Sequence, residues 1–170
     1  EFTILEWYRP GFTHHELMQE VDALMQHLFA TPNATKTTYH AAFNDHLDIN
    51  PHTAETTQLQ QLAQQHGHYA DSHELCRDDC LTLLFSTVIE PHLGKSSPEF
   101  IYDYPASQAA LARIRQDDPA VAERFELYYR GHELANGFHE LNCPKEQRRR
   151  FEAEQHQRQQ QQRPIPQIDP

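Results

Sequence analysis

Two neighbouring stretches near the end of the chain are predicted to be β-strands, and the second is interpreted with the two-residue period of a strand. They are Val121–Arg130 and His132–Leu141. A turn at Gly131 predicts a hairpin of two long strands and leaves Gly137 inside a strand, where a neighbouring group approaches the backbone closely. Asn136 followed by Gly137 is an equally good turn signal, and it would give two short strands with polar residues at their tip. The pattern alone leaves both arrangements open.

The second of these strands carries an unusual set of side chains on one face. Alternation with period two places four residues on that face: Leu134, Asn136, Phe138 and Glu140. It places the others on the opposite face: Glu133, Ala135, Gly137 and His139. A ring, an amide and a carboxylate in succession make a poor packing surface but a good pocket wall. Because an unpaired buried carboxylate is costly, Glu140 needs a cation beside it, and a ligand can supply one.

The amino-terminal stretch Phe2–Arg9 alternates as well and is predicted to be a strand. Glu6 repeats the pattern of Glu140, because it is a carboxylate among apolar neighbours with Tyr8 two residues further on. The alternative is an edge strand on which Glu6 pairs with a nearby arginine or lysine.

Helical periodicity follows this strand. Thr13 and Glu16 have the spacing of a capping box and predict a helix that continues to Phe29. Its apolar stripe is predicted to pack on the sheet and consists of Leu17, Val21, Leu24, Met25 and Leu28. Three of its histidines are predicted to be solvated: His14, His15 and His27.

Residues 31–94 differ in character and are predicted to be a helical insertion. Its helical patterns are Tyr39–Leu47, Glu55–His66 and Leu75–Val88. Glu99–Tyr104 then has the composition of a strand, and Pro144 suits the first turn of a last helix. Residues 163–170 form a Pro-rich tail to which we assign no structure.

The insertion holds five side chains of the types that bind zinc: His66, His68, His73, Cys76 and Cys80. Their spacing matches no zinc finger or ribbon. Cys76 and Cys80 lie one helical turn apart, where two small buried thiols fit equally well. We therefore favour a structural role for both cysteines.

Composition excludes several classes of protein. The 170 residues carry a formal net charge of −11, whereas a nonspecific nucleic-acid-binding protein has a basic surface. Three cysteines form no disulfide framework, so a cytoplasmic location is expected. No apolar stretch is long enough for a membrane span and no signal peptide is evident, so no membrane partner is expected. The chain has no initiator methionine and starts with a strand-like pattern, which suggests a piece of a longer protein.

Two separated motifs resemble one known family. Glu133-Leu-Ala-Asn-Gly-Phe-His-Glu140 is similar to the substrate strand of class II lysyl-tRNA synthetases, and Glu1–Tyr8 is similar to the second strand of their motif 2. The similarity is closer to the paralogues in this family that lysylate elongation factor P. Lysyl-tRNA synthetases usually carry a Glu and a Ser-Pro in the segment after Pro105. This chain has neither, which favours the paralogues over tRNA charging.

The resemblance implies an α+β fold for residues 1–162: a partial class II aminoacyl-tRNA synthetase-type antiparallel sheet flanked by helices. It implies a cytoplasmic, homodimeric full-length ligase that uses ATP and Mg²⁺. Such an enzyme converts lysine or β-lysine to an aminoacyl-adenylate and transfers the acyl group to a lysine of elongation factor P. The alternatives are transfer of lysine to tRNA, and a non-catalytic paralogue that senses lysine.

The resemblance also implies roles for individual residues. Five would bind the amino acid: Glu6 and Tyr8 at its amino end, and Asn136, Phe138 and Glu140 along its body and side-chain ammonium. Glu133 and Leu134 would contact ATP, with Glu133 as a catalytic residue and a Mg²⁺ ligand. Alternation places Glu133 on the face opposite Asn136 unless a bulge re-aims it. Motif 1, the motif 2 arginine and motif 3 are absent from these residues, so the 170-residue chain alone is expected to be inactive.

Overall fold

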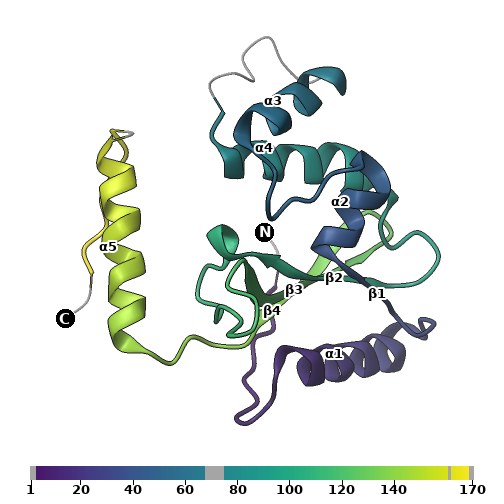
Figure 1. The fold of residues 1–170 in the computed structure, drawn as a ribbon. Coiled ribbons are helices and arrows are strands. Elements are labelled where there is room, and N and C mark those ends of the chain that lie inside the picture. The colour runs from purple at the N-terminus through teal and green to yellow at the C-terminus, as the bar shows by residue number, and fades with distance from the viewer. Residues whose placement is uncertain (1–2, 68–74, 161, 169–170) are drawn as a thin grey trace. The chain divides into compact units, whose positions relative to one another are not determined.

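The structure is a computed structural model that describes residues 3–67, 75–160 and 162–168. The chain separates into two compact units, Glu1–His139 and Glu140–Pro170. The first unit holds the sheet and most of the helices (Figure 1).

A four-stranded sheet forms the centre of the first unit, and its strands lie in the order β1-β2-β3-β4. The strands are β1 (Thr35–Thr38), β2 (Glu99–Pro105), β3 (Val121–Tyr129) and β4 (His132–Phe138). β1 pairs in parallel with β2, and the other two pairs are antiparallel. The sheet is therefore mixed. Four polar residues were too short a pattern to separate β1 from the helical insertion, and only its partner β2 makes it a strand.

The hairpin between β3 and β4 settles the alternative that the sequence left open. Arg130 and Gly131 have φ angles of 52° and 79°, as in a two-residue hairpin turn with both residues left-handed. Gly137 lies inside β4, so the Asn136 turn is wrong and the long strands are confirmed.

The strand predicted at Phe2–Arg9 is wrong over the part that the structure describes, because residues 3–9 have no strand structure. Ile4 and Leu5 are largely exposed, and no described strand pairs with this segment. Alternation by itself does not make a strand, since the backbone groups also need a neighbouring strand. Trp7 is the exception in the segment, because it packs against the hydrophobic core that includes Phe100 and Phe125.

Helix α1 (His14–Phe29) covers one face of the sheet (Figure 1). The capping box is confirmed, with Thr13 N donating to Glu16 Oε2 at 2.7 Å. Val21 and Met25 of the predicted stripe are buried, and the buried stripe also includes His14 and Met18, which were not predicted. Leu28 is exposed, and His14 is only 4% exposed instead of solvated. The helix is rotated relative to the predicted stripe because Met18 packs with Phe100, Phe125 and Leu127 of the sheet.

The helical insertion covers the other face (Figure 1). It consists of α2 (Tyr39–Leu47), α3 (Thr56–Gln65) and α4 (Arg77–Leu84), which confirm the three helical patterns. A π-helical turn, Phe85–Ile89, and a 3₁₀ turn, Glu90–His92, continue from α4. Aromatic rings join the insertion to the sheet, with Tyr39 and Phe85 stacked at 5.3 Å and both beside Tyr104.

The second unit is built on α5 (Pro144–Gln160), which begins at the predicted proline. Charged side chains form ion pairs along this helix, such as Glu146 with Arg149 at 2.7 Å. Within the described residues, no helix has the length and apolar character needed to cross a membrane.

Candidate functional site

A bulge in β4 brings two predicted site residues to the same face of the sheet. Asn136 lies opposite Glu126 of β3, whereas Glu133 lies opposite Tyr128, so Leu134 is the extra residue between them. Directly opposed residues of antiparallel strands point to one face. The bulge therefore places Glu133 on the same face as Asn136, toward the helical insertion. In a regular strand the two side chains would point to opposite faces.

An arginine and a glutamate of β3 lie at the centre of this face. Arg124 Nη2 donates to Glu126 Oε1 at 2.5 Å, and the two side chains are 15% and 11% exposed. Glu126 Oε2 accepts hydrogen bonds from the hydroxyls of Tyr104, at 2.5 Å, and Tyr128. Burial and the Glu126 carboxylate raise the pKa of both tyrosines, so each hydroxyl remains a donor at neutral pH.

Two further carboxylates lie near Glu126. Partial burial raises the pKa of Glu133, and the negative charge of Glu126 raises it further. Arg124 opposes this rise, and Glu90 adds a smaller one. Burial and Glu126 likewise raise the pKa of Glu90, which begins the 3₁₀ turn of the insertion. Three carboxylates and one arginine leave an excess of negative charge on this face, which favours a cationic ligand.

This excess of negative charge suits a magnesium ion whose other ligands come from a bound nucleotide. Among the described residues, no three His, Cys, Asp or Glu side chains are grouped to hold a metal ion. Mg²⁺ is commonly bound through one or two carboxylates together with phosphate oxygens of a substrate. Glu133 is the exposed carboxylate of the set and would be the residue to contribute.

The remaining predicted site residues fall in three places. Phe138 lies opposite Arg124, on the face of Asn136, and packs against a small cluster with Ala109 and Ala122. Leu134, at the bulge, is 47% exposed. Glu140 is exposed and belongs to the second unit, whereas the residues around Glu126 all belong to the first unit.

The amino-terminal pair of site residues lies on an exposed segment. Tyr8 OH donates to Glu6 Oε1 at 2.5 Å, which brings these two predicted residues together. The next residue, Arg9, pairs with Glu20 of α1, and Trp7 Nε1 donates to the same carboxylate at 3.3 Å. The segment is therefore attached to α1 through Trp7 and Arg9, while Glu6 and Tyr8 face solvent.

Residues 1–167 match the family model described as tRNA synthetases class II (D, K and N). The chain belongs to this family. Three curated relatives are each named elongation factor P–(R)-β-lysine ligase. The protein of Haemophilus influenzae is 47% identical over 169 residues, which cover 99% of this chain and 52% of the relative. That of Edwardsiella ictaluri is 51% identical over 160 residues, 93% of this chain and 49% of the relative.

The protein of Salmonella arizonae is 50% identical over the same shares of the two chains, 93% and 49%. This member of the class II synthetase family thus spans about half the length of the curated relatives that it matches. Family membership and the observed elements together confirm the α+β fold expected from the two motifs.

Two residues of this candidate site were not predicted from the sequence, Arg124 and Glu126. A signal for them exists, because Arg124, Glu126 and Tyr128 alternate with apolar residues along β3. The alternation did not say which face the insertion covers. Only the packed structure shows that these side chains of β3 are largely buried and not solvated.

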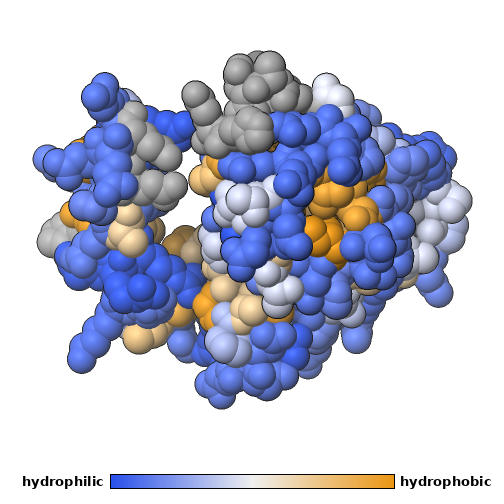
Figure 2. Space-filling model, turned by 45° about the horizontal axis from the view of Figure 1, so that its top comes forward, coloured by the Kyte–Doolittle hydropathy of each residue, from blue (hydrophilic) through white to orange (hydrophobic). Residues whose placement is uncertain are grey.

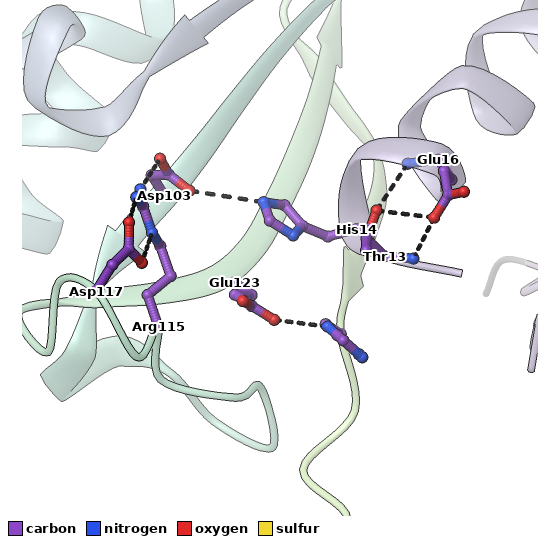
Figure 3. A network of polar contacts seen from close by, with 8 residues as sticks. Thr13, His14, Glu16, Asp103, Arg115, Asp117 and Glu123 are labelled. Atoms are coloured by element: carbon purple, nitrogen blue, oxygen red, sulfur yellow. Dashed lines mark hydrogen bonds and ion pairs between the residues drawn. The ribbon is translucent and has the colours of Figure 1, made fainter. Parts of the chain in front are cut away.

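A second polar network lies on the α1 side of the sheet (Figure 3). His14 of α1 points toward Asp103 of β2, with Nε2 3.6 Å from Oδ1, and Arg115 contacts Asp103 Oδ2 at 3.0 Å. Asp103 has a φ of 62° at a bulge in β2, which turns its carboxylate toward the helix. This network joins α1 to the sheet and belongs to the face opposite Glu126.

The cysteines and histidines of the insertion show no metal-binding group among the residues that the structure describes. Cys80 is fully buried in the core of the insertion, whereas Cys76 is exposed as the N-cap of α4, so the interpretation of two buried thiols is wrong for Cys76. His66 is exposed at the end of α3, while His68 and His73 lie outside the described residues.

Proposed function

We propose that the full-length protein uses ATP to activate lysine or β-lysine and transfers the acyl group to a lysine of elongation factor P. The observation that carries the proposal is similarity to ligases of that name over nearly the whole chain. The charge on the candidate site agrees with it. A substrate with two ammonium groups, and a nucleotide with its magnesium ion, both suit a face with an excess of carboxylates.

The proposed reaction has two steps. The substrate carboxylate attacks the α-phosphate of ATP, which forms an aminoacyl-adenylate and releases pyrophosphate. The amine of a lysine on elongation factor P then attacks the acyl carbon, forms an amide and releases AMP. Neither step needs a side chain as the nucleophile, so the protein contributes mainly position and charge. Mg²⁺, when bound, neutralises charge on the phosphates.

The residues of this chain have separate parts in the proposal. Glu133 supplies a carboxylate toward the nucleotide, and Leu134 is next to it at the bulge. Asn136 and Phe138 follow along the same face of β4 and are proposed to contact the amino acid. Glu6, Tyr8 and Glu140 are proposed to bind its amino groups, as charge-assisted hydrogen bonds suit ammonium ligands.

The proposal is tested with the full-length protein in pyrophosphate exchange with α-lysine and (R)-β-lysine, followed by mass spectrometry of elongation factor P. Exchange and a mass increase of one lysyl group are expected. Transfer to tRNA without modification of elongation factor P would replace the proposal with tRNA charging. Calorimetric binding of lysine without exchange would replace it with lysine sensing. The Glu133→Gln variant should lose exchange, whereas Glu152→Gln, an exposed change on α5, should keep it.

Figure 2 shows the surface from a direction turned toward the insertion. The part of the first unit in view is mainly hydrophilic and is interrupted by apolar patches.

A further inference from the structure

Arg124 is held in one orientation by partners in three directions. Nη2 donates to Glu126, and Nη1 donates to the backbone carbonyl of Gln108 at 2.9 Å. Its guanidinium carbon lies 4.6 Å from the centre of the Tyr104 ring, in a cation–π contact. Glu126 is itself held by the hydroxyls of Tyr104 and Tyr128. The direction of the Nε–H bond of Arg124 is therefore set by residues of β2, β3 and the turn after β2.

That Nε–H bond points at Asn136. Arg124 Nε lies 3.2 Å from the side-chain oxygen Oδ1 of Asn136. Arginine has donors and no acceptor, so the atom that faces it must be the amide oxygen. This removes the ambiguity of an asparagine amide, whose oxygen and nitrogen look alike in shape. The amide nitrogen of Asn136 consequently faces away from Arg124.

The amide nitrogen is available to a ligand. Asn136 is exposed on the edge strand β4, and within the described part of the chain its only side-chain hydrogen bond is the one to Arg124. Two N–H donors thus remain. They match an acceptor oxygen, and they cannot pair with an ammonium group, which offers donors only.

We infer that Arg124 is a positioning residue that orients Asn136 to donate hydrogen bonds to an anionic oxygen of the ligand. This deepens the proposed function and rests on it. It also changes the role expected for Asn136, from a contact near the side-chain ammonium to a contact with an acceptor. The anionic oxygen belongs either to the carboxylate of the amino acid or to a phosphate of ATP, and the same donors suit both.

The test compares three ligands on the full-length protein: lysine, 1,5-diaminopentane, which is lysine without its carboxylate, and ATP. Affinities are measured by calorimetry, with diaminopentane in competition with lysine. The variants are Arg124→Lys, which keeps the charge and loses the Nε donor, and Asn136→Ala, which removes an exposed side chain. Arg149→Lys makes the same change in an exposed ion pair of α5 and serves as the control.

If the carboxylate is the partner, both site variants should weaken lysine about tenfold and raise its KM in pyrophosphate exchange, and they should leave diaminopentane and ATP unchanged. If a phosphate is the partner, the affinity for ATP should fall about tenfold and the affinity for lysine should not change. Asn136→Asp should be worse than Asn136→Ala for the affected ligand, because Arg124 would hold one carboxylate oxygen and the other would repel the anion.

Equal losses for lysine and diaminopentane with ATP unchanged, or wild-type affinities in both site variants, would overturn the inference. Either result is distinct from failure of the proposed function, which would appear as absence of exchange in the unmodified protein. Asn136→Ala keeps the test valid where Arg124→Lys does not fold, since it changes only the exposed partner.

Discussion

Gly137 of β4 lies directly opposite Phe125 of β3, and the Phe125 ring occupies the space beside the glycine. A Cβ atom at Gly137 would lie 2.7 Å from Cε1 of that ring, which is closer than van der Waals contact allows. Phe125 is 1% exposed and packs edge-on against Phe100 at 5.5 Å, so it has little room to move. Position 137 thus requires a glycine, because the Phe125 ring leaves no room for a side chain.

Gly137→Ala is therefore expected to reduce the free energy of unfolding by about 1–3 kcal/mol, the usual cost of overpacking a core. Urea unfolding followed by circular dichroism measures it. The double variant Phe125→Leu with Gly137→Ala should be less destabilised than the sum of the two single variants, because the smaller side chain makes room. Strict additivity would show that the ring is not the cause.

Glu126→Gln is expected to cost about 3 kcal/mol of unfolding free energy, since breaking a buried ion pair leaves Arg124 without its counter-charge. A glutamine also offers one acceptor atom where the carboxylate accepts from two tyrosines and an arginine. Glu152→Gln on α5 is the matched control and should change stability by less than about 0.5 kcal/mol. Similar losses of unfolding free energy in both variants would show that the ion pair of Glu126 with Arg124 does not stabilise the fold.

Glu133 is expected to make stability depend on pH in a particular direction. Because its pKa in the folded protein is raised, the folded state holds this proton more tightly than the unfolded state. Ionisation of Glu133 thus opposes folding, an effect that is absent below about pH 4 and develops as pH rises through the raised value. Glu133→Gln should be more stable than the unmodified protein at pH 7, by less than about 1 kcal/mol because solvent screens the group.

The gain should vanish near pH 4, and thermal unfolding at the two pH values measures it. A variant that is less stable at pH 7 would show that the carboxylate is compensated by groups other than Arg124. The same variant should lose pyrophosphate exchange in the full-length protein, so that stability rises while activity falls.

Glu140→Gln is expected to weaken lysine-type ligands by around 2 kcal/mol or more, through loss of a charge-assisted hydrogen bond. Its effect on ATP affinity should be small, which makes ATP the internal control in a calorimetric titration of the full-length protein. Equal losses for lysine and ATP would mean that Glu140 supports the structure and does not contact the amino acid.

The sequence by itself determined the local elements of this protein and its family. Thr13 and Glu16 cap a helix through contacts only three residues apart, and the three helices of the insertion follow from their own periodicity. The Glu1–Tyr8 and Glu133–Glu140 motifs together sufficed for the family, because a motif is recognised along the chain without knowledge of which residues pack beside it.

The tertiary structure decided what depends on a partner distant in sequence. Phe2–Arg9 alternates like a strand and, where described, is not one, whereas Thr35–Thr38 shows little pattern and becomes a strand beside β2. The bulge at Leu134 turns Glu133 to the face of Asn136, which regular alternation excludes. Arg124 and Glu126 acquire their role because packing buries these two side chains of β3, and burial of this kind is a property that no local pattern contains.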